Sequence, residues 1–169
     1  MNALFLIADG FEDVHFFCLW NRLREEGVRV TLASPLGATV TGLRGHAVVT
    51  HTPIREVNPS EYDLLVIPGG YSPEKLRLRE DAVDITRTFM DEDRRVVIVG
   101  HAAQLLITVG SINGRRVTAS REIRDDIRAA GGIYRDEAVL VDGGLVSGRG
   151  SDEIPEVCRK MLAGLIVRS

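Results

Sequence analysis

The sequence predicts an α/β fold, a doubly wound and mostly parallel sheet with helices on both of its faces. Short apolar runs alternate along the chain with segments whose apolar residues recur at helical spacing. The runs are continuous, as expected of parallel strands that are covered on both faces. The 169 residues contain no internal repeat, linker or low-complexity stretch, and we predict a single domain over residues 1–169.

The N-terminal part of the chain predicts a strand, a helix and a second strand. Residues 4–8 form the first apolar run, and residues 13–26 carry one apolar helical stripe that Gly27 ends. Residues 28–33 form the next run. Over residues 36–53, glycines separate short segments of strand-forming residues, which indicates a hairpin.

The rest of the chain continues the alternation. In order, it predicts a strand at 63–67, a helix at about 80–92, a strand at 95–99, and helices at 102–110 and 121–130. Residues 142–144 form a tight turn between two valine-containing strands. A last helix, capped by Ser151 or Asp152, buries one face made of Ile154, Val157, Cys158, Met161, Leu162 and Leu165.

The composition excludes several classes of function. Hydrophobic residues make up 44% and charged residues 27% of the chain, and the formal net charge is −3, with no basic block for nucleic acid. No apolar run approaches the roughly 20 residues of a membrane span. Cys18 and Cys158 lack metal-ligand spacing, which fits a reduced, cytoplasmic setting. We expect both in the core rather than acting as nucleophiles.

Ligands of such sheets bind beyond the carboxyl ends of the strands, and three strand ends supply candidate groups there. Glu12 is a candidate acid or base, although the helix dipole alone would favour a carboxylate in the first turn of a helix. His101 is a candidate general base or acid, with a packed, hydrogen-bonded histidine as the alternative. Gly69 and Gly70 could stabilise an oxyanion through their amides, or form only a flexible turn.

The other polar residues near these strand ends have simpler interpretations. Glu74 lies just beyond the glycine pair, where an exposed surface carboxylate is the default. The cluster near residue 12 is interpreted as the acidic start of a helix, and comprises Asp9, Glu12, Asp13 and His15. We predict neither a metal nor a cofactor, because metal-ligand spacing is absent around His15, His46 and His51.

Residue 100 is the most informative position in the chain. Residues 96–106 predict a buried strand, a sharp turn and a helix, which is the architecture of a nucleophile elbow. Such a turn lifts a Ser or Cys above the edge of the sheet, but Gly100 stands at its tip. The sequence therefore predicts the scaffold of a catalytic site without its nucleophile.

Four segments carry a resemblance to a known family. They are, in this order, ADGFEDVHFFCLWNRLREEGVRVTLAS, YDLLVIPGGYSPEKLRL, VVIVGHAAQLL and DGGLVSGRGSDEIPEVCRKML. Together they resemble the PfpI/ThiJ family, also described as intracellular protease- or glyoxalase III-like proteins. The resemblance runs from about residue 3 to residue 166. It implies the flavodoxin-like, class I glutamine amidotransferase-like fold of that family.

The resemblance also implies roles for individual residues. The family's elbow cysteine falls on Gly100 and its histidine on His101, and the glutamate that hydrogen-bonds the cysteine falls on Glu12. In the hexameric branch, a glutamate from a neighbouring subunit that orients the histidine falls on Glu74. The oxyanion amides fall on Gly70 and His101. A homodimer or homohexamer is implied in the same way.

A second departure from the family pattern lies downstream of the elbow. Many members have Tyr-Pro where this chain has Ser120 and Arg121, in a segment that the resemblance places near the site. An arginine at 121 or 149 would suit an anionic substrate, although exposed arginines are common on protein surfaces.

The missing nucleophile decides the functional prediction. Without a thiolate there is no thioester or hemithioacetal route. We favour a thiol-independent enzyme of hydratase, lyase or isomerase type that acts on a small molecule, with Glu12 and His101 as acid and base. The alternative is a catalytically retired member that acts as a ligand-binding, regulatory or chaperone-like protein. A hydrolase or peptidase of the family type, using Cys18 or a bound water, ranks lowest.

Overall fold

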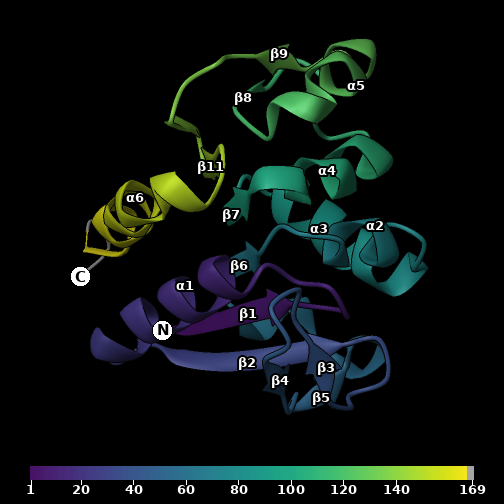
Figure 1. Cartoon of the computed structure of the whole chain (residues 1–169), viewed down its shortest axis with the longest axis vertical. Helices are drawn as coiled ribbons and strands as arrows, with labels where there is room; N and C mark the ends of the chain where they lie inside the picture. The colour runs from purple at the N-terminus through teal and green to yellow at the C-terminus, as the bar shows by residue number, and fades with distance from the viewer. Residues whose placement is uncertain (167–169) are drawn as a thin grey trace.

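A computed structural model describes residues 1–166 and shows a seven-stranded sheet between two layers of helices (Figure 1). The strand order is β10-β11-β7-β6-β1-β2-β5, and all neighbours are parallel except β10 and β11. This confirms the predicted mostly parallel, doubly wound sheet. The strands are β1 (Asn2–Leu6), β2 (Arg29–Ser34), β5 (Thr52–Pro53), β6 (Leu64–Ile67), β7 (Arg95–Val99), β10 (Val139–Asp142) and β11 (Leu145–Gly148).

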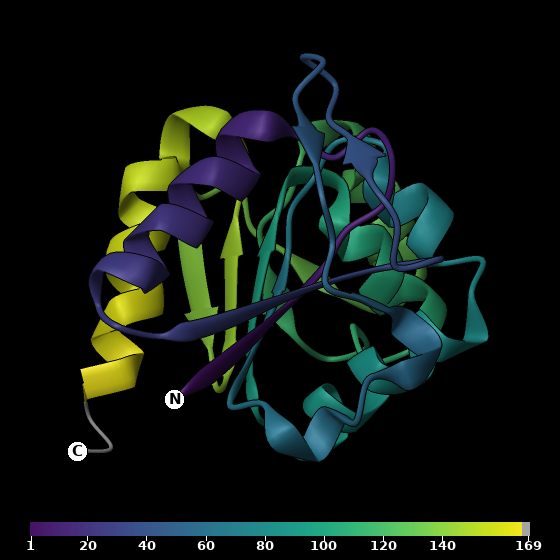
Figure 2. The same ribbon diagram turned by 90° about the horizontal axis from the view of Figure 1, so that it is seen from below.

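Helices cover both faces of the sheet. One face carries α1 (Asp13–Glu25) and α6 (Ile154–Ile166), which pack against each other and lie together at one side of Figure 2. The other face carries α2 (Ser72–Leu76), α3 (Glu80–Asp91), α4 (Ala103–Val109) and α5 (Arg124–Ala129). Short 3-10 helices lie at Ile54–Glu56, Pro59–Glu61, Gly100–Ala102, Arg121–Ile123 and Ser151–Glu153.

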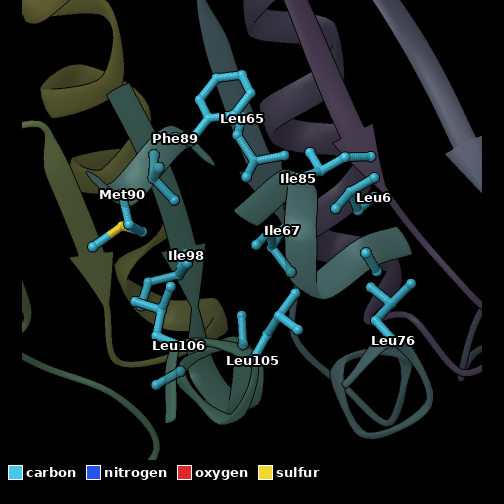
Figure 3. Close-up of a cluster of buried hydrophobic side chains, with 14 of the residues drawn as sticks. Leu6, Leu65, Ile67, Leu76, Ile85, Phe89, Met90, Ile98, Leu105 and Leu106 are labelled. Atoms are coloured by element: carbon cyan, nitrogen blue, oxygen red, sulfur yellow. The ribbon is translucent and has the colours of Figure 1, made fainter. Parts of the chain in front are cut away.

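Two hydrophobic clusters hold these layers on the sheet. Successive residues of a strand point to opposite faces, so Leu4 and Leu6 of β1 enter the cluster beneath α3 and α4, whereas Phe5 enters the cluster beneath α1 and α6. Figure 3 shows the first cluster, in which Leu65 and Ile67 of β6 lie among side chains of the covering helices. Burial on both faces explains why the apolar runs are continuous.

The hairpin predicted over residues 36–53 forms in part. Its first part forms the antiparallel pair β3 (Val40–Thr41) and β4 (Ala47–Val48), as expected, but its end becomes β5 and joins the main sheet beside β2. Two features were not predicted. Helix α2 has only five residues, fewer than periodicity can reveal, and the parallel pair β8 (Arg116–Val117) and β9 (Ile133–Tyr134) has two residues per strand.

The two cysteines differ in burial. Cys158 is buried in the core, as predicted. Cys18 is exposed, so the prediction that it lies in the core is wrong. The buried apolar stripe of α1 consists of Phe16, Leu19 and Leu23. Cys18 lies two positions after Phe16, so the side chain of Cys18 points to another side of the helix.

None of the helices within residues 1–166 has the length and apolar character that a bilayer span requires.

The buried central strands predict a large difference between two leucines. Leu65 is 0% exposed in β6, and Leu78 is 83% exposed after α2. Leu65→Ala should lower the free energy of unfolding by about 2–5 kcal/mol, because it removes buried methyl groups and leaves a cavity. Leu78→Ala, the matched control, should change it by less than about 0.5 kcal/mol. Urea unfolding of the two variants measures the difference, and equal losses would contradict this assignment of the core.

Candidate active site

The turn after β7 has the elbow shape that the sequence predicts. β7 ends at Val99, Gly100 follows with φ +62°, and residues 100–102 form a 3-10 helix that leads into α4. A φ in the left-handed region is strained for residues with a side chain, whereas glycine adopts it readily. Gly100 therefore adopts the backbone conformation that the turn requires, and it places no reactive side chain at the tip.

The space beside Gly100 is bounded by three groups from distant parts of the chain. A Cβ placed on Gly100 would lie 3.3 Å from Ser120 Oγ, 3.4 Å from His15 Cε1 and 3.8 Å from the carbonyl oxygen of Arg149. Residue 120 thus lies next to the elbow, as the resemblance implied. A side chain at residue 100 would fit only if Ser120 or His15 moved by a few tenths of an ångström.

His15 is the buried residue that connects this region. Its side chain belongs to α1, yet its Nδ1 accepts a hydrogen bond of 3.1 Å from Gly69 N–H at the end of β6. Because Nδ1 is an acceptor, the ring proton of the neutral imidazole lies on Nε2 and is donated to Ser151 Oγ at 3.1 Å. The pKa of His15 is lowered to about 4, chiefly by burial; the charge of Glu12 raises it, and Arg44 and His101 lower it.

Sequence reasoning did not assign His15 to the site. It interpreted this residue as part of the acidic start of a helix and found no metal-ligand spacing around it. A signal was present, because His15 lies three residues after Glu12 and therefore on the same side of α1. The structure places His15, rather than Glu12, within 3.4 Å of the position that a Cβ of residue 100 would occupy.

Glu12 is the N-cap of α1, which is the simpler of its two interpretations. One carboxylate oxygen, Oε2, accepts a hydrogen bond of 3.0 Å from His15 N–H, and Oε1 accepts one of 3.0 Å from Arg44 Nε. The Glu12 side chain is largely buried, while that of Arg44 is exposed. Both carboxylate oxygens thus have partners, and a catalytic role for Glu12 stays a prediction.

Asp13 holds the β3–β4 hairpin against the start of α1. Its carboxylate accepts hydrogen bonds from Arg44 N–H at 2.9 Å and from the side chain of His46, Nδ1, at 2.7 Å. Burial raises the pKa of Asp13, but hydrogen bonds from Arg44 and His46 outweigh it, so the pKa lies below its usual value. The hairpin that carries Arg44 is therefore fixed beside Glu12.

The two amides of the glycine pair differ in their hydrogen bonds. Gly69 donates its N–H to His15 Nδ1 in this arrangement, and its role as an oxyanion donor stays a prediction. Gly70 has φ +82°, and a Cβ there would lie 2.4 Å from Gly10 O, so glycine alone fits. Within residues 1–166, the N–H of Gly70 has no hydrogen-bond partner and remains available to a ligand.

Three residues of the predicted segment and its surroundings, Ser120, Arg121 and Arg149, line a surface hollow. This hollow of about 510 Å³ is lined in part by Ser120, Ser151 and Arg149, and none of the elbow residues lines it. Arg149 pairs with Glu153 at 3.1 Å and with Asp136 at 2.8 Å. Arg121 also pairs with Asp136, at 3.1 Å, so neither arginine is an isolated charge for an anionic substrate.

His101 and Glu74 lie nearer the surface. The imidazole of His101 is half-buried in the turn that follows Gly100, and Glu74 is exposed on α2. Among residues 1–166, no three side chains of the His, Cys, Asp or Glu type form a group that could hold a metal ion.

Comparison with known proteins identifies the family. The model of the DJ-1/PfpI family matches residues 1–164. The chain belongs to the DJ-1/PfpI family. This confirms the resemblance that the four sequence segments carry.

Named relatives add information about activity. The chain is 44% identical over 149 residues to deglycase PfpI of Pyrococcus furiosus, covering 88% of this chain and 90% of the relative. It is 39% identical over 160 residues to protein/nucleic acid deglycase 2 of Escherichia coli, covering 93% of each. A two-domain crystal structure from Anabaena variabilis, with DJ-1/ThiJ/PfpI-like and ferritin-like domains, matches with a TM-score of 0.94 and 30% identity, over 97% of this chain and 48% of that one.

These relatives correct the functional prediction. The sequence favoured a thiol-independent hydratase, lyase or isomerase, with a retired, non-catalytic member as the alternative. Relatives of similar length that are 39–44% identical are named deglycases, which is a specific enzyme function of another kind. The prediction gave too much weight to a single residue, Gly100, whereas the identity to the named deglycases extends over 88–93% of the chain.

The depressed pKa of His15 predicts a loss of stability in mild acid. Between its ordinary value of 6.5 and its value of about 4 in the folded protein, the unfolded chain binds a proton at residue 15 that the folded chain does not. The free energy of unfolding should therefore fall as the pH drops through this window, by about 3 kcal/mol at most.

Urea unfolding at several pH values measures this effect. His15→Gln removes the titrating group, so the variant should be less stable at neutral pH but should lose markedly less stability between about pH 7 and about pH 5. If the wild type and the variant lost equal stability over this range, His15 would not be the group responsible.

Proposed function

We propose that this protein is a deglycase, which releases an amine from its adduct with a small carbonyl compound. The observation that carries the proposal is the 44% identity to deglycase PfpI over 88% of the chain, with 90% of the relative covered. The site supports it with an elbow, an unpaired amide at Gly70 and a half-buried imidazole at His101, all at the carboxyl edge of the sheet.

The reaction is written as the hydrolysis of an imine, R–N=CH–R′ + H₂O → R–NH₂ + O=CH–R′. Because residue 100 has no side chain, water supplies the nucleophile. The water oxygen bonds to the imine carbon and the nitrogen takes up a proton. The C–N bond of the resulting carbinolamine then breaks, and its electron pair leaves with the nitrogen. The imidazole of His101 carries protons between these atoms, and such groups typically contribute about 10²–10⁴-fold to a rate.

Assembly into a homodimer or homohexamer is part of the proposal and follows from the resemblance alone. Glu74 is exposed on α2 in the isolated chain. A residue that contacts a neighbouring subunit has to be exposed in this way.

An amine-release assay tests the proposed function. N-acetyl-lysine or a lysine peptide, treated with glyoxal as the probe carbonyl compound, should release free amine faster in the presence of the protein. His101→Ala should lower kcat/KM by about 10²–10⁴-fold, because the proton carrier is lost. The release can be followed with an amine-reactive fluorophore and by NMR.

A second histidine provides the matched control. His51 is exposed, and its ring accepts a hydrogen bond from Leu32 N–H at the edge strand β2, so His51→Ala should retain the wild-type rate. No acceleration by the wild-type protein, with any of the adducts, would refute the proposed function.

A further inference from the structure

Two free thiols line one hollow on the surface, outside the candidate active site. Cys18 lies on α1 and is exposed, whereas Cys158 lies on α6 and is only 5% exposed. The hollow has a volume of about 310 Å³ and lies between these two helices, which pack against each other in Figure 2. We refer to it as the α1–α6 hollow. It brings an accessible and a buried thiol to the same site.

The floor of the α1–α6 hollow is apolar. Ile154, Cys158 and Leu162 line it at intervals of four residues, so they lie on one side of α6, and all three are buried. Pro155 also lines the hollow and is exposed at its edge. Such a floor favours a hydrocarbon group over a polar one, because binding removes apolar surface from water.

Two arginines line the hollow, and both are paired with glutamates of their own helix. Arg22 forms ion pairs with Glu25 and with Glu26, the latter at 3.3 Å. Arg159 donates a hydrogen bond of 2.7 Å from Nε to the carboxylate of Glu156. Because these glutamates offset the positive charges, the hollow has no excess charge for an anion and favours an uncharged ligand.

The two thiols differ in reactivity. Burial raises the pKa of the Cys158 thiol to about 11, and negative charge on Cys18 raises it as well. Because the thiolate is the nucleophilic form of cysteine, Cys158 stays protonated and unreactive at neutral pH. Cys18 is exposed at the edge of the hollow, where an electrophile can reach its sulfur. Cys18 is therefore the nucleophile of this site, and Cys158 is part of its floor.

We propose that Cys18 is a covalent modification site for uncharged α,β-unsaturated aldehydes whose alkyl chain occupies the α1–α6 hollow. In this class of molecule, the β-carbon that sulfur attacks also carries the alkyl chain. A bond to Cys18 at the edge of the hollow therefore places the chain beside the apolar floor. This inference is independent of the proposed deglycase function and uses none of its residues.

The addition balances without an oxidant or a leaving group. The thiol of Cys18 loses its proton to water, and its sulfur donates an electron pair to the β-carbon. The electrons of the C=C double bond move to the α-carbon, which takes up a proton from water. The sum is protein–SH + R–CH=CH–CHO → protein–S–CHR–CH₂–CHO.

The deciding experiment compares two aldehydes. Crotonaldehyde and 2-octenal have the same reacting atoms and differ only in the length of the alkyl chain. For the protein, the rate constant with the octenal divided by that with crotonaldehyde should exceed the same ratio for N-acetylcysteine by about 10-fold, because only the protein buries the chain. Mass spectrometry of peptides, after borohydride reduction of the bound aldehyde, measures the rate at each residue.

Four variants separate the thiol from the hollow. Cys18→Ser should abolish the adduct, and Cys158→Ala should keep it. Pro155→Asp adds a charge at the edge of the hollow without changing either thiol, and should remove most of the preference for the octenal. Leu36→Asp is the matched control, because Leu36 is 74% exposed and does not line the hollow, and it should keep the preference.

Each outcome decides part of the proposal. Equal ratios for the wild-type protein and N-acetylcysteine would overturn the role of the hollow, even if Pro155→Asp fails to fold. An adduct that forms on Cys158 or on lysines in place of Cys18 would overturn the assignment of the site. A preference for the octenal that Pro155→Asp loses and Leu36→Asp keeps supports the proposal.

Discussion

The site depends on the buried imidazole of His15. This side chain extends from the first turn of α1. Its Nδ1 accepts a hydrogen bond from Gly69 N–H at the end of β6, and its Nε2–H donates one to Ser151 Oγ at the start of the last helical segment. It therefore joins three separate parts of the fold at the carboxyl edge of the sheet. The hydrogen bond from Gly69 needs the neutral ring, since a protonated Nδ1 could not accept it. The low pKa of His15 and the integrity of the site are two consequences of one arrangement.

Two carboxylates at the start of α1 connect this region to the β3–β4 hairpin by hydrogen bonds. Glu12 caps the helix and pairs with Arg44, while Asp13 accepts hydrogen bonds from the backbone of Arg44 and the ring of His46. The positive end of the helix dipole favours both negative charges. The acidic pair thus has a structural role that is sufficient to account for it, whatever part Glu12 plays in catalysis.

Gly100 at the tip of the elbow is compatible with the proposed function, in which water supplies the nucleophile. The Ser120 hydroxyl and the His15 ring border the position that a Cβ of Gly100 would occupy. The half-buried His101 follows Gly100 in the turn, and the named relatives are deglycases. Imine hydrolysis requires a positioned water and a proton carrier but no covalent intermediate with the protein.

The sequence by itself determined the layered fold, because continuous apolar runs and helical stripes reflect how each segment is buried. It also determined the elbow, the glycine at its tip and the family. It did not reveal α2 or the β8–β9 pair, since elements of two to five residues carry no period. Only the tertiary structure decided that Cys18 faces solvent, that Gly69 is engaged, and that His15 and Ser120 border Gly100. These contacts join residues that are 20 to 136 positions apart, and local spacing holds no information about such distances.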